Sequence, residues 1–392
     1  MPNPPKLLIL AASTYQIPFI VAARRLGCHV LTVDNRPDNP GHRLADQALH
    51  CDTTDTVRLV EIAREHRVDG VMAAATDVAL DAAAAIAAGL DLPGPSPACT
   101  HVLTRKIAFR QLQATLGLPT PPHTTSAAAP PSFAGPWIVK PNRASGSKGI
   151  RIVDDSAGLE AAWRFAGSES VDGLALAEAF VAGRQGTLEG VVQDGRIRAA
   201  MATDRITARP PAVGTRGHRV PANLPVDVLR ELESQVERLF AGLDYRDGPF
   251  DADFVVDARG QALLLEVTPR AGGNSLVRLL QHACGFDMPA YVVQTALGRA
   301  PGVAPFTIRP TELEILSADR PGVITYRDSE LDAIRAMPGV CHLELDVPSG
   351  ARVRGFADGR DRLGELVVSA DTAQTLDERL LQVRTALQLR CH

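Results

Sequence analysis

FDADFVVDARGQALLLEVTPRAGG, residues 250–273, is the stretch of the chain that decides the fold. Its two halves are rich in strand-forming residues, and the turn residues 258–260 between them predict a β-hairpin. Asp253 and Glu266 then occupy opposite positions on one face, so both carboxylates can reach one divalent cation. Glu266 also ends a buried leucine run, where an acid is rarely found without a role. The alternative is that both are rim charges of a solvated hairpin.

A lysine and a glycine-rich loop lie upstream of the hairpin. The predicted strand WIVKP (137–141) carries Lys140 and leads into ASGSKG (144–149). Small residues in such a loop let backbone N–H groups approach phosphate oxygens, and Lys148 adds a cation. The loop is not a Walker A motif, because GxxxxGK[ST] is absent. The alternative is a flexible surface loop that happens to carry a lysine.

A single arginine, Arg270, lies directly behind the hairpin, in the turn PRAGGN before another helix. Its planar guanidinium is suited to holding a transferred phosphate through two hydrogen bonds. A surface arginine at the start of a helix is the alternative.

The first hundred residues alternate buried strands with helices. Continuous apolar runs at 6–12, 29–34 and 70–75 are separated by helix-period segments, one of them at about 56–66. This alternation is typical of a parallel sheet with helices on both faces. Ligands of such sheets bind beyond the carboxyl ends of the strands.

Three loops are therefore expected along one rim of this sheet: residues 12–16, the loop after Asp34, and Thr76-Asp77. Tyr15 and Gln16 either contact substrate there or only start the first helix.

The rest of the chain reads as a mixture of helices and short strands. Helices are expected near 106–116, 156–166, 225–241 and 371–388. Strands are expected at 149–155, 174–180, 187–193, 312–317, 342–347 and 366–369, with a joining loop at 182–186 and a long irregular stretch at 203–221. The predicted fold class is α/β in three parts: an N-terminal parallel βαβ domain (1–97), a central α+β domain (98–300) and a small C-terminal α+β domain (301–392).

Composition excludes several classes of protein. The 392 residues carry a formal net charge of −4, which gives no sign of a nucleic-acid partner. The six cysteines form no CxxC pair, which argues against a structural zinc site or a disulfide framework. The N-terminal apolar run of about seven residues is too short to span a bilayer. We expect a cytoplasmic protein with no membrane contact.

Taken together, these motifs resemble the ATP-grasp superfamily. The resemblance rests on Lys106 in a helix, Lys140 with ASGSKG, the segment 178–181 (EAFV) before Gly183, and Asp253 with the segment 266–273 (EVTPRAGG). It covers residues 1–300, and the C-terminal part resembles the end domain of the amino-acid-ligase and carbamoyl-phosphate-synthase-like branches.

This resemblance implies a pre-ATP-grasp domain, an ATP-grasp domain with a mobile lid subdomain at about 136–175, and a C-terminal domain that packs on the ATP-grasp core. It also implies an ATP-dependent carboxylate–amine ligase that works through an acyl phosphate and releases ADP and phosphate. The implied cofactors are ATP and Mg²⁺, with Mn²⁺ as an alternative, and the implied partners are a small-molecule carboxylate and an amine. A homodimer is a further expectation.

The resemblance gives individual positions their roles. Lys106 and Lys140 are expected on the α- and β-phosphates, the glycine-rich loop closes over the triphosphate, the strand at 178–181 reads adenine, and Gln185 stands near the ribose. The implied nucleotide-binding residues are Lys106, Lys140, Ser145, Gly146, Ser147, Lys148, Gly149, Glu178, Ala179, Phe180, Val181 and Gln185.

The metal and substrate assignments follow from the same resemblance. Asp253, Glu266 and Thr268 are the expected metal ligands, although Thr268 stands where the family's ExNxR pattern has Asn. Arg270 and Lys140 are the expected catalytic residues. The expected substrate residues are Arg205, Arg216, His218, Arg219, Arg270, Gly273 and Asn274. A solvated basic loop is the alternative for the four residues between 205 and 219.

Three other functions stay open. A nicotinamide-dependent oxidoreductase fits the opening βαβ unit but lacks GxGxxG in the first loop. A nucleotide-binding protein without ligase turnover is suggested by Thr268 and Gln185. A ligase of the purine-biosynthesis or bicarbonate-activating type, with a substrate other than an amino acid, is the third.

Overall fold

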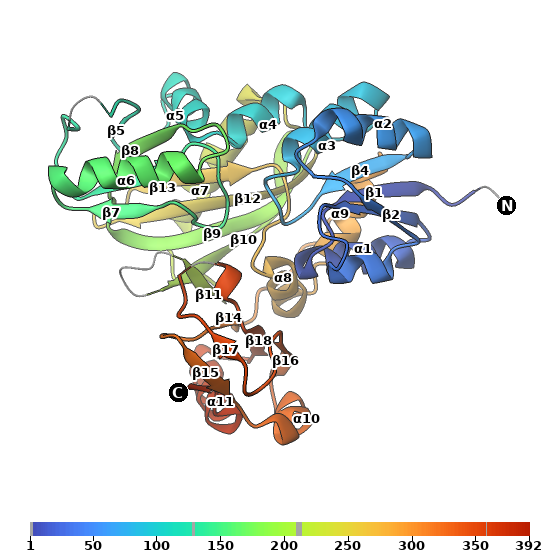
Figure 1. The fold of residues 1–392 in the computed structure, drawn as a ribbon, viewed down its shortest axis with the longest axis vertical. Helices are drawn as coiled ribbons and strands as arrows, with labels where there is room; N and C mark the ends of the chain where they lie inside the picture. Colours follow the sequence, from blue (N-terminus) through green and yellow to red (C-terminus); the bar gives the residue numbers. More distant parts are fainter. Residues whose placement is uncertain (1–2, 128–129, 209–213, 358) are drawn as a thin grey trace.

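The computed structural model describes residues 3–127, 130–208, 214–357 and 359–392. Figure 1 shows an N-terminal α/β part at one end, long curved strands through the middle and a small C-terminal part below them. Within the described residues, no helix has the length and apolar character needed to cross a bilayer. The six cysteines carry free thiols.

The N-terminal sheet is parallel, as the alternation of strands and helices predicts, with the order β3-β2-β1-β4. Leu7 and Ile9 pack in one core and Leu8 and Leu10 in another, because helices cover both faces. The short third strand was not predicted, because its residues alternate between exposed and half-buried. The elements are β1 (Lys6–Leu10), α1 (Ile17–Arg25), β2 (His29–Asp34), β3 (Gln47–His50), α2 (Thr56–His66), β4 (Gly70–Ala73) and α3 (Leu80–Leu90).

A small antiparallel sheet with one helix, here called the lid subdomain, overlaps the segment 136–175 where the lid is expected and extends beyond it at both ends. Its order is β5-β8-β6-β7, and Val139, Ala162 and Ala177 form its core with neighbouring residues. The helices α4 and α5 connect it to the N-terminal sheet. The elements are α4 (Pro97–Leu103), α5 (Lys106–Thr115), β5 (His123–Thr124), β6 (Trp137–Pro141), β7 (Arg151–Val153), α6 (Ser156–Glu169) and β8 (Ala175–Ala179).

The central sheet has eight strands in the order β13-β12-β9-β10-β11-β14-β18-β16. It runs without a break across the predicted boundary at 300/301, because β14 pairs with β11. The boundaries at 97/98 and 300/301 stay predictions. The elements up to this boundary are β9 (Gly183–Gln193), β10 (Arg196–Thr207), β11 (Thr215–Val220), α7 (Val226–Gly242), β12 (Gly248–Asp257), β13 (Ala262–Thr268), α8 (Leu276–Cys284) and α9 (Met288–Ala296).

The C-terminal part adds three strands to the central sheet and a second, small sheet of β17, β15 and β19. Its core lies between the helix α11 and the strand β18. The elements are β14 (Thr311–Leu316), β15 (Gly322–Thr325), α10 (Leu331–Arg335), β16 (Val340–Leu345), β17 (Arg352–Val353), β18 (Gly364–Ser369), α11 (Ala373–Leu387) and β19 (Arg390–Cys391).

Two loop predictions were wrong. The stretch 203–221, expected to be irregular, contains the end of β10 and the strand β11, which pair antiparallel with Asp204 opposite Arg219; residues 209–213 lie outside the described part of the chain. The joining loop expected at 182–186 mostly belongs to β9, which begins at Gly183. Polar side chains occupy both faces of these strands, some lining the cavity described below (Gln185, Arg205, His218) and others forming ion pairs elsewhere (Arg216, Arg219), which hides the apolar alternation of a half-buried strand.

The N-terminal sheet is held tightly against the rest of the molecule. Helix α1 packs on α9, and both contribute to one buried core. A side chain at Gly70 would meet the carbonyl oxygen of Ala296 at 2.6 Å, so β4 passes directly over the end of α9. These contacts hold the N-terminal sheet in a fixed position relative to the central sheet.

Candidate active site

The predicted hairpin is present, with Asp253 directly opposite Glu266 and Asp251 opposite Thr268. Because positions two apart on a strand share a face, these four side chains present their oxygens to one side. All four line a cavity of about 660 Å³ between the lid subdomain, the central sheet and the N-terminal sheet.

The acids at the centre of this face are balanced by cations. Asp253 accepts hydrogen bonds from Arg205 Nη1 at 3.0 Å and Thr187 Oγ1 at 2.6 Å, and Lys106 Nζ lies 3.4 Å from Glu266 Oε1. Burial alone would raise the pKa of Asp253, but Arg205 and Thr187 outweigh it and hold the pKa below its ordinary value. Anionic carboxylates beside a hydroxyl form an all-oxygen donor set that fits Mg²⁺.

A buried ion triad lies behind Lys140. Glu178 accepts hydrogen bonds from Arg110 Nε at 2.7 Å and Lys140 Nζ at 2.6 Å, and Glu178 and Arg110 are each 1% exposed. Although burial raises the pKa of Glu178, the two cations hold it well below its ordinary value. The Glu178 side chain therefore anchors Lys140. Arg110 was missed by the sequence analysis, and the polar Arg110 and Gln113 inside the buried stripe of α5 are the signal that could have found it.

The glycine-rich loop borders the same cavity through Ser145, Gly146, Ser147 and Lys148. Gly149 lies at its base rather than in the lining, with φ of +72°. A Cβ at this position would lie 2.6 Å from Pro141 and 2.7 Å from Glu169. Gly149 is therefore required by the packing of the loop onto the lid.

We expect Gly149→Ala to destabilise the lid and to weaken ATP binding, because the variant combines an unfavourable positive φ with a steric overlap that costs roughly 1–3 kcal/mol. Gly146→Ala is the matched control, since its φ is +70° and nothing lies within 4 Å of the added methyl. Denaturant unfolding and calorimetric ATP titration of both variants check this. Equal losses in the two would contradict the packing role of Gly149.

The predicted adenine strand only partly reaches the cavity. Phe180 and Gln185 line it, whereas the backbone N–H groups of Ala179 and Phe180 donate to Pro122 and Pro136. Those two N–H groups are thus used within the protein. Val181 lies two residues beyond the end of β8 at Ala179.

Arg205 and His218 face each other across β10 and β11 and both line the cavity. Thr203 Oγ1 accepts from the Thr187 N–H at 3.3 Å and is hydrogen-bonded to His218 Nδ1, 2.9 Å away. The other ring nitrogen, Nε2, is buried and has no partner among the described residues. Burial and the charge of Arg205 lower the His218 pKa to about 3. His218 is therefore neutral, and its Nε2 is available for a hydrogen bond with a ligand.

Two predicted substrate residues do not line the cavity, and their role stays a prediction. Arg219 Nη1 lies 2.7 Å from Asp377 on α11, because its strand position faces away from that of His218. Arg216 Nη1 reaches Asp319 at 2.7 Å, and its guanidinium stacks on the Phe356 ring. Both arginines join β11 to the C-terminal part.

Arg270 connects the central sheet to the N-terminal rim. Its guanidinium lies 2.6 Å from Asp77 and 3.8 Å from Asp251, and it lines the cavity with Gly273 and Asn274. Burial raises the Asp251 pKa to about 7, against the opposing charge of Arg270. Burial and the neighbouring Asp251 raise the pKa of Glu189 well above its ordinary value.

The rim prediction is confirmed, since Ser13, Tyr15, Arg36, Thr76 and Asp77 all border the cavity. Gln16 does not contact it, because its buried side chain bonds to Ser13 and to the carbonyl oxygen of Ala74. The C-terminal part also contributes to the lining, through Gly359 and Arg360. Sequence reasoning missed these two, because the loop before β18 carries no motif.

Known proteins resemble each part of the chain. The ATP-grasp N-terminal domain family matches residues 20–94, the ATP-grasp domain family matches 133–278, and the family described as L-amino acid ligase C-terminal domain 2 matches 314–392. The uncharacterized protein y4rH of Sinorhizobium fredii is 27% identical over 381 residues, which are 92% of this chain and 77% of that protein.

Two further relatives have named activities. The formate-dependent phosphoribosylglycinamide formyltransferase of Burkholderia cenocepacia is 34% identical over 190 residues, 46% of this chain and about half (47%) of that enzyme. The crystal structure of an L-amino acid ligase from Bacillus licheniformis shares the fold, with a TM-score of 0.83 at 19% identity and full coverage of both chains. Three segments of the chain therefore match domain families of the ATP-grasp type, and the last of them matches the C-terminal domain of L-amino acid ligases.

Proposed function

We propose that the chain joins the carboxylate of one amino-acid-type substrate to the amine of another, with ATP as the source of energy. The observation that carries the proposal is the convergence of Lys140, Glu266 and Arg270 on one cavity, from segments far apart in the sequence. These groups match the needs of phosphoryl transfer to a carboxylate, in which positioning and charge neutralisation supply most of the acceleration.

The proposed reaction has two steps. The substrate carboxylate attacks the γ-phosphate of ATP, ADP leaves, and an acyl phosphate forms. The amine then attacks the acyl carbon and phosphate leaves, so the amide bond forms at the expense of one ATP. Lys106 and Lys140 would hold the triphosphate, and Arg270 would follow the transferred phosphate through both steps.

Asp253 and Glu266, assisted by Thr268, would hold Mg²⁺, which neutralises phosphate charge when bound. His218 Nε2 and Arg205 would add hydrogen-bonding groups for a ligand from the opposite strands. The glycine-rich loop would cover the triphosphate and exclude water, which otherwise hydrolyses an acyl phosphate.

The amino-acid class is supported by charges of both signs at the rim of the cavity. Asp77 and Asp251 lie beside Arg270, while Arg36 and Arg360 border the outer end. A zwitterionic substrate needs an anion for its ammonium group and a cation for its carboxylate. The match of residues 314–392 to the L-amino acid ligase C-terminal domain agrees with this choice. We expect the enzyme to act in the cytoplasm on small molecules and to form a homodimer.

A second candidate is a ligase with a purine-precursor amine, favoured by the 34% identity to the formyltransferase over 190 residues. Its substrates would be formate and phosphoribosylglycinamide, the two compounds in the name of that relative. The experiment below includes both.

The test uses carboxylates labelled with ¹⁸O, incubated with the protein, ATP, Mg²⁺ and a panel of amines. We expect an ATP-dependent amide product by mass spectrometry, together with one ¹⁸O atom in the released phosphate, because the attacking carboxylate oxygen stays on phosphorus. Product from formate and phosphoribosylglycinamide would select the second candidate. Phosphate without the label, or ADP release that no carboxylate stimulates, would sink the acyl-phosphate mechanism.

A further inference from the structure

The loop at residues 270–275, which carries Arg270, Gly273 and Asn274, has an unfavourable backbone. Asn274 and Ser275 are consecutive residues with φ of +50° and +60°. Residues other than glycine seldom adopt this left-handed conformation, and they keep it only where their surroundings impose it. Two buried glutamates from different strands supply such surroundings.

The first is Glu189 on β9. Both of its carboxyl oxygens accept the Gly272 N–H, at 2.9 and 3.0 Å, and the side chain is fully buried. A side chain at Gly272 would overlap Glu189 and Asp251, so the carboxyl groups pack directly against the loop backbone. Glu189 thus fixes the middle of the loop from below.

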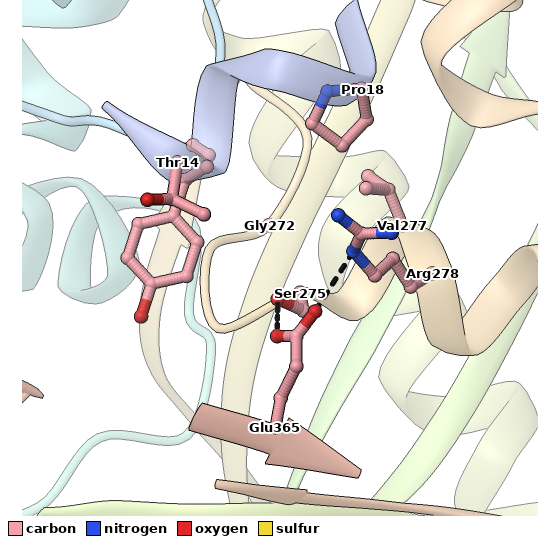
Figure 2. A pocket seen from close by; sticks show the side chains of 9 residues that line it. Thr14, Pro18, Gly272, Ser275, Val277, Arg278 and Glu365 are labelled. Carbon is pink, nitrogen blue, oxygen red and sulfur yellow. Dashed lines mark hydrogen bonds and ion pairs between the residues drawn. The ribbon is translucent and has the colours of Figure 1, made fainter. Parts of the chain in front are cut away.

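The second is Glu365 on β18 of the C-terminal part, which is 1% exposed. It accepts hydrogen bonds from the Ser275 hydroxyl and from Arg362 Nη1, the latter at 3.0 Å, and Arg278 Nε lies 2.9 Å away. Figure 2 shows the Glu365 side chain pointing from its strand toward Ser275 and Arg278. Gly272 and Thr14, which belongs to the N-terminal part of the chain, border the same pocket. Glu365 thus fixes the far end of the loop.

The N-terminal sheet holds the same loop at a third point, where the Ala75 N–H donates to the Ala271 carbonyl oxygen at 3.2 Å. All three parts of the chain therefore meet on this loop. Arg362 strengthens the junction, since its guanidinium also stacks on Tyr15, with its carbon 5.2 Å from the ring centroid.

We propose that Glu189 and Glu365 are positioning residues, which hold the loop 270–275 so that Arg270 faces the transferred phosphate. This inference rests on the proposed function. Both carboxyl groups act through the loop, Glu189 through the backbone of Gly272 and Glu365 through the Ser275 hydroxyl. The C-terminal domain thereby takes part in catalysis without contributing Glu365 itself to the reacting groups.

The main experiment compares Glu189→Leu with Glu189→Gln. Leucine removes the acceptor of the Gly272 N–H, and we expect kcat to fall about 100-fold, since a displacement of about 1 Å costs this much. KM for ATP stays within about threefold, because Lys106, Lys140 and the lid are untouched. Glutamine keeps an acceptor oxygen, so Glu189→Gln retains kcat within about threefold.

Ser275→Ala tests the second anchor, because it removes the hydroxyl and leaves Glu365 with its arginines. We expect about a tenfold loss of kcat with KM for ATP unchanged. Ser96→Ala is the matched control, because Ser96, like Ser275, is the residue before the first turn of a helix. The Ser96 hydroxyl accepts the Cys99 N–H at the start of α4, which does not line the cavity. The control keeps the kcat of the unmodified protein.

Hydrogen–deuterium exchange of residues 270–276 reports on the anchors without any turnover. We expect slow exchange in the unmodified protein and in Glu189→Gln, and fast exchange in Glu189→Leu. If the unmodified protein forms no amide, the proposed function fails while this readout still tests the anchors.

The inference is overturned if Glu189→Leu keeps its kcat despite a freely exchanging loop. It is equally overturned if Glu189→Gln is as slow as Glu189→Leu, or if Glu189→Leu loses ATP affinity in the same proportion as kcat.

Discussion

The Glu266→Gln variant is expected to lose turnover by roughly 10³-fold, because a metal ion on phosphate supplies several kcal/mol of charge stabilisation and each 1.36 kcal/mol is a factor of ten. Glutamine keeps the shape of the side chain and an acceptor for Lys106, 3.4 Å away, but not the negative charge. In this variant, Asp253 would be the only one of the two paired acids that still offers a negative charge to the cation. Product formation under saturating ATP measures the loss.

Two further measurements separate this effect from misfolding. The Glu266 side chain is 35% exposed, so its loss of charge changes the unfolding midpoint little. Glu61→Gln, at an exposed position on α2, is the control and keeps ordinary turnover. ATP titrations with and without Mg²⁺ then show whether the metal-dependent part of binding is lost. Ordinary turnover in Glu266→Gln would remove Glu266 from the metal site.

The hairpin and the parallel sheet were predictable because each depends on local pattern. Alternation over 250–268 sets the register, and a register slip would turn Asp253 and Glu266 to opposite faces. The observed pairing of Asp253 with Glu266 confirms the prediction. The rim loops followed from a general property of parallel sheets, whose carboxyl ends share one edge.

The polar part of the site was less predictable, because its partners are distant in sequence. Arg110 and Glu178 are 68 positions apart, and Glu189 and Gly272 are 83 apart. A buried charge gives no apolar periodicity, so its partner emerges only from the fold. The sequence showed the basic residues between 203 and 221. Because the strand β11 was not predicted, the sequence could not show that His218 and Arg219, as consecutive strand residues, face opposite sides.

Arg110→Met is expected to lower the free energy of unfolding by about 3–5 kcal/mol, the usual cost of leaving a buried charge without one of its partners. Arg110 and Glu178 are each 1% exposed, and the guanidinium also donates to the carbonyl oxygens of Leu264 and Leu265 at 3.2 and 3.1 Å. Methionine fills much of the volume, so the loss is electrostatic rather than a cavity. Urea unfolding of Arg110→Met beside Arg64→Met, an exposed position on α2, measures it.

The same variant has a signature in its pH dependence. Arg110 and Lys140 hold the Glu178 pKa below its ordinary value, so the triad's stabilisation is present above the unfolded pKa of about 4.3 and is lost as pH falls through the folded pKa. Without Arg110 that pKa rises, and stability in acid falls at higher pH than in the unmodified protein. Lys140 still pairs with Glu178 in Arg110→Met, so adding Glu178→Gln leaves the buried Lys140 ammonium without an anion and should deepen the loss. If the single variant unfolds like Arg64→Met, or if the second substitution recovers the loss, the triad is not what holds Lys140 in place.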